Sequence, residues 1–434
     1  MTRCQIVPPY LLERIASAHP DQDACACGAR TLEIDAELRT RRSTAVAVPT
    51  ASPGDKPFAV YTASNASTLP GRKVRAAGAT PTGDPAVDEA HDGVQASLAL
   101  FKEVFGRDSY DGQGAAVVAT VHYQRDYDNA FWDGDQLVFG DGDGKVFDRF
   151  TKPVDVLGHE LSHAVTQFTA NLTYQGQSGA LNESISDVFG SCLKQRLLGQ
   201  TADEADWLIG EGIFLPPVQG RALRSMAEPG TAYDDPALGK DPQVATMADY
   251  VDTQDDNGGV HTNSGIPNKA FHLAATGIGG TSWDGAGKIW YAALTSGISA
   301  DTDFAGFAAA TVTAAEAVSP EAADVVRCAW EQVGVTGTAV PSSGSTTPAT
   351  GRVAVTRTGG FAGVRQSGEL TLGVDPRTDE VSSLLDRIDL RAVTPSRPQP
   401  DRFVYTFDVD GQHVVVGEQD LTDDLGRLAR LLLD

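Results

Sequence analysis

His159-Glu160-Leu161-Ser162-His163 is the stretch of sequence that decides the fold. The apolar residues around it recur at helical spacing from Val154 onward, and four residues of helix return the second histidine to nearly the same face as the first. Two imidazoles in these positions can bind one zinc ion. Glu160 is offset by one residue, about 100° around the helix, so it borders the metal as a general base without ligating it. On its own, the pentapeptide is equally compatible with a polar stripe on a surface helix.

A second helical stretch, Asn182-Glu183-Ser184-Ile185-Ser186-Asp187, follows the first along the chain. A catalytic zinc needs three protein ligands and an open position for water, and Glu183 can supply the third ligand. Asp187 lies one helical turn later on the same face, where its carboxylate can accept the free N–H of a ligating imidazole. The alternative, a solvated helix face, explains poorly why the two stretches occur together.

Four segments of the chain together resemble the thermolysin family of zinc metallopeptidases, over about residues 58 to 338. They are Asp128 to Trp132, Asp155 to Thr166, Gly179 to Gly190, and Asp255 to Asn268. The resemblance implies an α+β fold with two lobes, a β-rich N-terminal lobe and an α-helical C-terminal lobe, with the zinc site between them. It also implies a neutral endopeptidase that cuts internal peptide bonds before large apolar residues.

The resemblance implies a role for each matching site residue. Zinc would be bound by His159, His163 and Glu183, with Asp187 and Asn182 behind the imidazoles. A proton would pass from the attacking water to the leaving amine through Glu160. Hydrogen bonds to the oxyanion would come from Tyr174 and from His261, which Asp256 would orient.

The resemblance also implies how a substrate is held. Asn129 and the carbonyl of Ala130 would bind the peptide backbone, and Arg224 would bind the carbonyl that follows the scissile bond, for which its rigid fork is suited. An apolar pocket for the adjacent side chain would be lined by Phe147, Phe150, Val156, Ile209 and Leu223.

The pattern departs from the family where carboxylates bind two calcium ions. Asp155, Asp206 and Glu211 match that cluster, but Lys194 and Leu208 stand where further carboxylates would be. An ammonium group there would replace the charge of one cation and repel another. A double calcium site is therefore not expected, whereas a single calcium ion stays an open alternative.

The N-terminal segment Cys4 to Leu12 resembles the short inhibitory propeptide of protealysin-like members of the family. Pro8-Pro9 would stiffen an extended segment that lies along the cleft. The Cys4 thiolate is a candidate cap for the zinc, against the alternative of a buried or surface cysteine. We expect the precursor to process itself between about residues 40 and 60, in an exposed connector, with candidate bonds before Ala45, Val46 and Val48.

The C-terminal part of the chain follows a linker-like run, Pro341 to Thr350, and its strand and helix patterns predict a small ββαββα domain. The stretch Arg357 to Arg365 is similar to emfourin, a protein inhibitor of protealysin-like enzymes. A tethered regulator is therefore expected, with a targeting or substrate-binding appendage as the alternative. The expected domains are a propeptide (1–50), a β-rich lobe (51–153), a helical lobe (154–338), a linker (339–350) and an inhibitory domain (351–434).

Composition restricts the partners and the compartment. A formal charge of −24 argues against nucleic acid, and no apolar run is long enough to span a membrane. The five cysteines do not form a disulfide or zinc-binding pattern. A monomer is expected. No signal peptide is readable in the first fifteen residues, so secretion is expected only from the resemblance, with an intracellular location as the alternative.

Two other functions are compatible with the sequence. The chain could act as a binding or inhibitory protein whose peptidase core stays blocked by either flank, although the complete catalytic set argues against this. It could also be another zinc hydrolase, such as an aminopeptidase, which would cut a terminal rather than an internal bond.

Overall fold

The computed structural model describes residues 5–42, 57–335, 352–359, 364–371, 403–409, 412–418 and 423–433, together with 377, 381, 384, 385 and 421. The chain folds as two compact units, residues 1–340 and 341–434. The predicted Cys4 cap, the candidate cleavage bonds before Ala45, Val46 and Val48, and the linker 339–350 lie outside the described residues.

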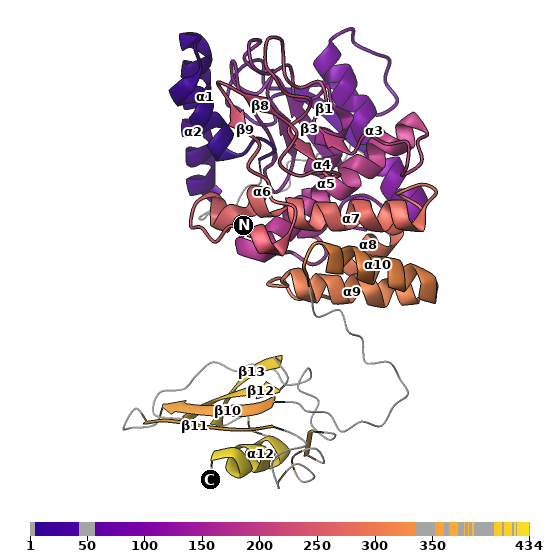
Figure 1. Ribbon diagram of the computed structural model, residues 1–434. Coiled ribbons are helices and arrows are strands. Elements are labelled where there is room, and N and C mark those ends of the chain that lie inside the picture. The colour runs from indigo at the N-terminus through magenta and orange to yellow at the C-terminus, as the bar shows by residue number, and fades with distance from the viewer. Residues whose placement is uncertain are drawn as a thin grey trace. The chain divides into compact units, whose positions relative to one another are not determined.

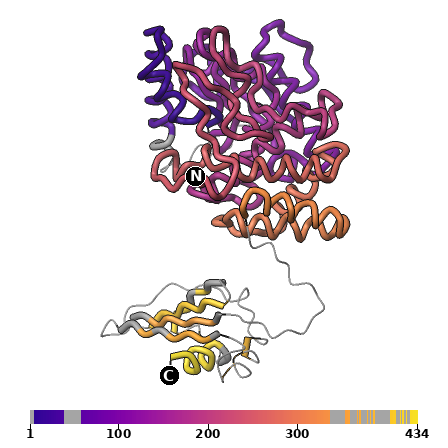
Figure 2. The backbone as a smooth tube through the Cα atoms, in the orientation of Figure 1, coloured from indigo at the N-terminus to yellow at the C-terminus, as the bar shows by residue number. Residues whose placement is uncertain are grey.

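Two helices form the N-terminal segment, α1 (Pro9–Ala18) and α2 (Gln22–Arg42). They pack against each other and appear side by side in indigo (Figures 1 and 2). α1 begins directly after Pro8 with a proline in its first turn, where no N–H is needed. α2 begins at Gln22, where the Asp21 carboxylate accepts hydrogen bonds from the first free N–H groups of the helix.

The first lobe contains a five-stranded sheet in the order β2-β1-β3-β5-β4. Its strands are β1 (Phe58–Thr62), β2 (Arg72–Ala76), β3 (Val117–Val121), β4 (Ala130–Trp132) and β5 (Leu137–Phe139). β1, β3 and β5 are parallel, whereas β2 and β4 run antiparallel to their neighbours. β1 and β3 are buried along their whole length, and helix α3 (Pro85–Phe105) packs against both. β4 is an edge strand, so its outer side is open to another peptide.

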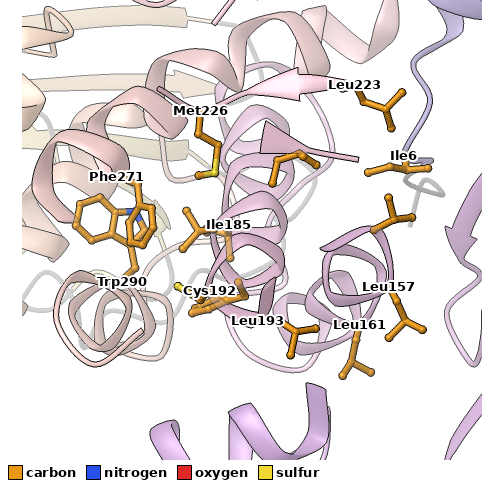
Figure 3. Close-up of a cluster of buried hydrophobic side chains, with 14 of the residues drawn as sticks. Ile6, Leu157, Leu161, Ile185, Cys192, Leu193, Leu223, Met226, Phe271 and Trp290 are labelled. Atoms are coloured by element: carbon orange, nitrogen blue, oxygen red, sulfur yellow. The ribbon is translucent and has the colours of Figure 1, made fainter. Parts of the chain in front are cut away.

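The second lobe is helical, as the resemblance predicts. Its helices are α4 (Val154–Gln167), α5 (Gly176–Leu198), α6 (Asp256–Asn263), α7 (Gly265–Ile278), α8 (Ala286–Leu294), α9 (Phe304–Glu316) and α10 (Pro320–Gln332). Between α5 and α6 lie β6 (Leu208–Ile209), β7 (Arg224–Ser225), β8 (Asp234–Asp235), β9 (Gly239–Lys240) and η2 (Met247–Asp249). Phe271 and Trp290 are among the large side chains that fill the core, and their rings lie edge to face (Figure 3).

A close crossing of α4 and α5 brings the two predicted zinc helices together. A Cβ atom added to Gly190 would lie 2.6 Å from the carbonyl oxygen of Asp155, and one added to Gly158 would lie 3.0 Å from the Cα of Gly190. Both distances are too short for a side chain. The two glycines therefore allow the helix backbones to approach, which brings the side chains after Gly158 in α4 close to the side chains before Gly190 in α5.

The C-terminal unit has the predicted strands and helices. β10 (Arg352–Gly359), β11 (Val364–Thr371), β12 (Phe403–Val409) and β13 (Gln412–Gly417) form an antiparallel sheet in the order β11-β10-β12-β13, and α12 (Asp423–Leu433) ends the described chain. Val381, Leu384 and Leu385 are helical. Leu425 and Leu428 of α12 are buried in one cluster with Val353, Val355 and Phe407 of the sheet. Among the described residues of both units, no helix is long and apolar enough to cross a membrane.

Candidate metal centre and substrate cleft

Three ligand atoms converge between α4 and α5. The Nε2 atoms of His159 and His163 approach to 2.9 Å, and each lies 3.5 Å from a carboxylate oxygen of Glu183. Ligands about 2.0 to 2.1 Å from a tetrahedral zinc lie about 3.3 Å from one another, so these separations fit the ion. All three residues are buried, and among the described residues they are the one group that could hold a metal.

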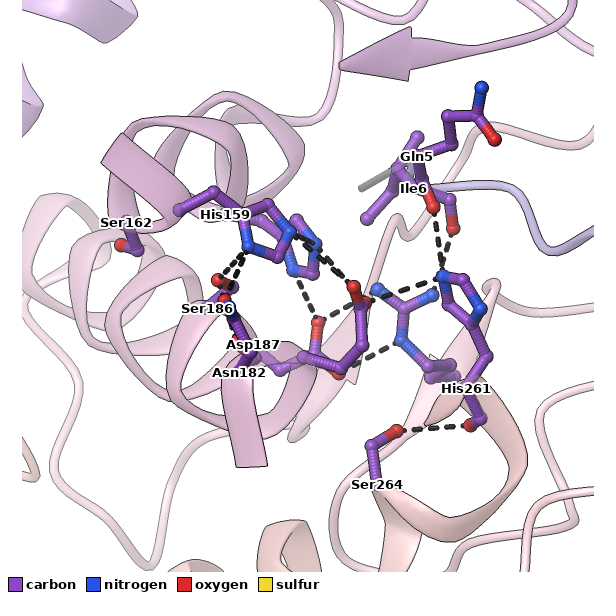
Figure 4. A network of polar contacts seen from close by, with 12 residues as sticks. Gln5, Ile6, His159, Ser162, Asn182, Ser186, Asp187, His261 and Ser264 are labelled. Carbon is purple, nitrogen blue, oxygen red and sulfur yellow. Dashed lines mark hydrogen bonds and ion pairs between the residues drawn. The ribbon is translucent and has the colours of Figure 1, made fainter. Parts of the chain in front are cut away.

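The far side of each imidazole is held by a hydrogen-bond acceptor (Figure 4). Nδ1–H of His159 donates to Asp187 at 2.8 Å, and Nδ1–H of His163 donates to Asn182 at 2.9 Å, with the hydroxyl of Ser186 3.0 Å away. These bonds fix the tautomer in which both Nε2 lone pairs face the metal position. Burial and the neighbouring His159 lower the pKa of His163 to about 3, which keeps this ligand neutral.

Asp187 joins the metal centre to the substrate cleft. Both of its oxygens accept hydrogen bonds from Arg224 at 2.8 Å, and Oδ2 also accepts one from Asn268 at 2.9 Å. Burial alone would raise the pKa of Asp187, but Arg224 and His159 lower it well below its usual value. The carboxylate therefore stays ionised and fixes one end of the Arg224 fork, while the other end faces the cleft.

Glu160 follows the candidate ligand His159 directly in α4, and its carboxylate interacts electrostatically with that of Glu183. Its side chain is fully buried, and neither carboxylate oxygen forms a hydrogen bond with the described residues. Burial and the nearby Glu183 carboxylate raise the pKa of Glu160 well above its usual value, which suits a group that takes up and releases a proton. The Tyr174 hydroxyl donates to Glu183 at 2.5 Å, so it faces the same small space.

His261 is held in place by an unusual turn at the start of α6. Asp256 accepts hydrogen bonds from the backbone N–H of His261 at 2.9 Å and from Nδ1–H at 2.8 Å. The turn needs positive φ angles from Asp256 to Gly259, and a Cβ on Gly258 would lie 2.9 Å from a backbone nitrogen. Although burial lowers it, Asp256 and Glu183 raise the pKa of His261 to about 9. A protonated ring donates through Nε2.

The N-terminal segment lies in the cleft and contacts the predicted substrate-binding groups (Figure 4). Nε2–H of His261 donates to the Gln5 carbonyl at 2.9 Å, and the N–H of Ile6 donates to the Ala130 carbonyl at 3.2 Å. Arg224 donates to the Ile6 carbonyl at 2.9 Å. Residues 5 and 6 therefore extend the edge of β4, where Gln5 pairs antiparallel with Phe131.

Asn129 holds the next residue of the segment by both ends of its amide. Its Oδ1 accepts from the N–H of Val7 at 2.9 Å, and its Nδ2 donates to the carbonyl of Val7 at 3.2 Å. Nδ2 also donates to Asp35 of α2 at 3.1 Å, and the same carboxylate accepts a hydrogen bond from Tyr127 at 2.6 Å. Asp35 of helix α2 therefore holds Asn129 in the position in which it binds Val7 of the extended part.

The side chains predicted to line an apolar pocket are buried. Phe147, Phe150, Val156, Ile209 and Leu223 belong to the main hydrophobic core cluster, which also contains Ile6. Figure 3 shows Ile6 next to Leu223. Ile6, a buried apolar residue, thus makes the backbone contacts that the resemblance implies for the residue that follows a scissile bond.

Comparisons with known proteins agree with this geometry. Residues 48–167 match the family described as "Thermolysin metallopeptidase, catalytic domain", and residues 170–335 match "Thermolysin metallopeptidase, alpha-helical domain". An "Extracellular metalloprotease" of Pectobacterium carotovorum subsp. carotovorum is 46% identical over 334 residues, which cover 76% of this chain and 96% of that protein. The chain belongs to the thermolysin family of metallopeptidases.

Two further relatives and a third domain match complete the comparison. "Protease PrtS" of Photorhabdus sp. (strain Az29) is 45% identical over 76% of this chain and 91% of that protein. The solved precursor of protealysin from Serratia proteamaculans is 49% identical, with a TM-score of 0.70 over 77% of this chain and 100% of that chain. Residues 355–433 match the family named Emfourin.

This member of the thermolysin family fills its candidate calcium cluster with a lysine. Nζ of Lys194 lies 2.8 Å from Asp206, 3.0 Å from Glu211 and 4.0 Å from Asp155, and it donates to the Leu208 carbonyl at 3.4 Å. Although burial lowers it, the three carboxylates raise the pKa of Lys194, so the ammonium stays charged. The oxygens that would ligate calcium face this group, so the residues fit a bound calcium ion poorly.

Three functional features were missed from the sequence. Within the Cys4 to Leu12 segment that we expected to lie along the cleft, the sequence did not indicate that Gln5, Ile6 and Val7 make the contacts. An apolar Ile-Val pair ahead of two prolines was a readable signal for an apolar pocket. Residue spacing did not indicate the other two features. These are the position of the Lys194 ammonium among the carboxylates of its cluster and the hydrogen bond from Asn268 to Asp187.

Proposed function

We propose that the chain is a zinc-dependent neutral endopeptidase made as a self-blocking precursor. The observation that carries the proposal is the occupancy of its cleft: each group predicted to hold a substrate backbone holds residues 5–7 instead. A binding protein with a permanently blocked core would need no base beside the metal position, yet Glu160 is there and forms no hydrogen bond among the described residues.

Each catalytic group has a position that suits one step. Zinc, held by His159, His163 and Glu183, would polarise the substrate carbonyl and favour ionisation of a water molecule. Glu160 takes a proton from the attacking water and returns it to the leaving amine. His261 and Tyr174 donate hydrogen bonds to the developing oxyanion, a contribution of about 3 to 4 kcal/mol for one such donor.

The burial of Ile6 supports a specificity for large apolar residues after the cut bond. The five side chains proposed to line the pocket are apolar and lie in the same core cluster as Ile6. Peptides with Leu, Phe, Ile or Val in this position should be cut, as mass-spectrometric mapping of a peptide library would show. A preference for Lys, Arg or Asp would contradict the assignment of the pocket, and release of single terminal residues would favour an aminopeptidase.

Activation requires removal of the N-terminal segment. The connector between α2 and β1, with its bonds before Ala45, Val46 and Val48, is the proposed cleavage region. Because residues 5–7 fill the cleft of their own molecule, the connector must be cut by a second, already active molecule. The rate of connector cleavage should therefore rise with protein concentration and after addition of mature enzyme, and Glu160→Gln protein alone should stay full length. Trimming of that variant in a protease-deficient host would contradict self-processing.

The C-terminal unit is a candidate inhibitor tethered to the peptidase. Its match to Emfourin supports this role, since a tether raises the local concentration of a weak inhibitor. Deleting residues 341–434 should raise the activity of the processed enzyme, and the isolated domain added back should lower it. If neither occurs, the unit is a targeting or substrate-binding appendage.

Secretion and the monomeric state are also proposed. Relatives that are named extracellular metalloproteases support secretion; detection of the chain in culture medium, with a cytoplasmic marker retained in the cells, would test it. The conflict between Lys194 and a bound calcium ion supports zinc as the one metal cofactor. Light scattering of the purified Glu160→Gln chain would test the monomer.

A further inference from the structure

The contacts in the cleft define which peptide bond faces the catalytic groups. His261 donates to the carbonyl of Gln5, and the Ala130 carbonyl accepts from the N–H of Ile6. These two atoms belong to the same peptide unit. Within the segment, the atoms that Arg224 and Asn129 bind all follow this peptide unit. These contacts fix both the direction of the segment in the cleft and the residue that meets each binding group.

The carbonyl of this peptide unit and the candidate metal centre contact the same ring nitrogen of His261. Nε2 of His261 is 2.9 Å from the Gln5 oxygen and 3.4 Å from Oε2 of the zinc ligand Glu183. Glu160, one residue from His159, is fully buried, and its oxygens form no hydrogen bonds with the described residues. The base that the reaction needs is therefore not neutralised by a contact with the segment.

The two side chains that follow the bond agree with the specificity proposed above. Ile6, which follows the bond, is fully buried in the cluster that contains the five pocket residues, and Val7 is fully buried as well. A segment that only obstructed the cleft would not need an apolar side chain in this pocket together with backbone hydrogen bonds on both sides of one peptide unit.

We propose that the Gln5–Ile6 bond is the first bond that the precursor hydrolyses, within its own molecule. This inference rests on the proposed peptidase function. The water oxygen bonds to the Gln5 carbonyl carbon, the carbon–nitrogen bond to Ile6 breaks, and Glu160 transfers a proton from the water to the Ile6 nitrogen. The products are a carboxyl group on Gln5 and an amine on Ile6.

The cut does not by itself activate the enzyme. Residues 1–5 lose their covalent link, whereas Ile6 and Val7 keep their bonds to Arg224 and Asn129 and stay connected to α1 and α2. Leu11, Leu12 and Ile15 of α1 remain buried. The trimmed segment is therefore retained as a bound product until the connector after α2 is cut.

The covalent state of the N-terminal segment tests the proposal. Intact-mass analysis of the wild-type full-length chain, purified at low concentration, should find a chain that begins at Ile6 before any cut in the connector. The fraction trimmed should not change over a tenfold dilution, because the reaction is intramolecular. Glu160→Gln protein should keep residues 1–5, apart from ordinary removal of Met1.

Variants at position 6 separate the cut from mere blocking. Ile6→Leu should be trimmed like the wild type, whereas Ile6→Pro, which lacks the N–H that donates to Ala130, should be trimmed at least a hundredfold more slowly. In the Glu160→Gln background, Ile6→Asp should lower the melting temperature and the exposed control Glu13→Gln should not. An unchanged melting temperature for Ile6→Asp would contradict the burial of this residue in the pocket.

The same samples distinguish two kinds of failure. If the connector is cut and an added quenched peptide is hydrolysed while the released segment still carries residues 1–5, the inference is wrong and the peptidase function stands. If neither the connector nor the added peptide is cut by wild-type protein with bound zinc, the proposed function itself is wrong.

Discussion

Two charge clusters lie along the same pair of helices, one buried and one partly exposed, and they obtain their positive charge in different ways. At the metal centre, the ligand atoms of His159, His163 and Glu183 converge on one position, and the cationic ring of His261 lies beside them, 3.4 Å from Glu183 on the cleft side. At the second cluster, Asp155 of α4 lies near Lys194 of α5, whose ammonium also contacts Asp206 and Glu211.

The difference shows how one lysine changes a site's need for metal. Buried carboxylates are costly unless a countercharge is close. Burial raises the pKa of Asp155 to about 6 even with Lys194 nearby, so this carboxyl group needs the ammonium. At the metal centre, Asp187 and Arg224 pair with each other, and His261 contacts one oxygen of Glu183. The Nε2 lone pairs of His159 and His163 still face the common position, so this centre can recruit an ion from solution.

The largest expected effect comes from removing the base of the metal centre. Glu160→Gln should lower kcat/KM by about 10²- to 10⁴-fold or more, because an amide cannot accept the proton of the attacking water. The zinc ligands are unchanged, so zinc should remain bound. Hydrolysis of a quenched peptide measures the loss, and activity within tenfold of the wild type would exclude the assigned role.

The next effect concerns the support of a zinc ligand. Asp187→Asn keeps the shape of the side chain but removes the charge that binds Arg224 and receives Nδ1–H of His159. Zinc affinity should fall by about 10- to 100-fold, as competition with a chelator would measure. Ser186→Ala is the matched control, since Asn182 still accepts the hydrogen bond from His163; equal losses in both variants would argue against a specific role for Asp187.

Removing the internal cation should turn the second cluster into a calcium site. In the Glu160→Gln background, Lys194→Met should lower the free energy of unfolding by about 1 to 3 kcal/mol, less than for a fully buried pair because Asp206 and Glu211 are partly exposed. Added calcium should then raise its melting temperature and leave that of the parent unchanged.

The exposed pair of Lys288 with Asp284 provides the control for this variant. Lys288→Met should change stability by no more than about 1 kcal/mol and should create no response to calcium. If calcium stabilises the parent protein as strongly as it stabilises Lys194→Met, the ammonium does not take the place of the ion.

The smallest effect is expected at a third carboxylate cluster, whose cation can titrate. His122 contacts Asp141 at 2.8 Å and Asp84 at 3.0 Å, and the hydrogen bond to Asp141, with those charges, raises its pKa to about 9. A raised pKa stabilises the fold fully below the unfolded value of about 6.5, and this stabilisation is lost as the pH rises through 9.

His122→Gln should therefore cost about 1 kcal/mol or less at pH 6, after allowance for partial exposure, and almost nothing at pH 10. Denaturant unfolding at both pH values measures the difference. His272 is the control, because burial lowers its pKa to about 4 and it stays neutral over this range. A pH-independent loss at His122 would show that its role is packing.

The two zinc helices could be predicted because their signals are local. The ligand spacing in His159 to His163 requires a helix, and the predicted stretches lie within α4 and α5. The four strands of the C-terminal unit were predictable for the same reason, from alternation within each segment. A pattern of this kind depends only on residues a few positions apart.

Contacts between distant segments could not be predicted in the same way. The sequence indicated that the N-terminal segment lies along the cleft, but it did not indicate that Ile6 is the residue that contacts Arg224. Residue spacing determines which side chains share a helix face, but not how far the segments before and after the helix approach it. The contacts of Lys194 with Asp206 and Glu211 could not be predicted for the same reason.

The central claim is that the chain recruits one metal ion and supplies the second cation itself. Metal analysis of the purified full-length Glu160→Gln protein, by inductively coupled plasma mass spectrometry after dialysis, tests it most directly. The account predicts one zinc ion per chain and no stoichiometric calcium, and no bound zinc in His163→Ala. Stoichiometric calcium in the Glu160→Gln protein, or zinc retained by His163→Ala, would contradict it.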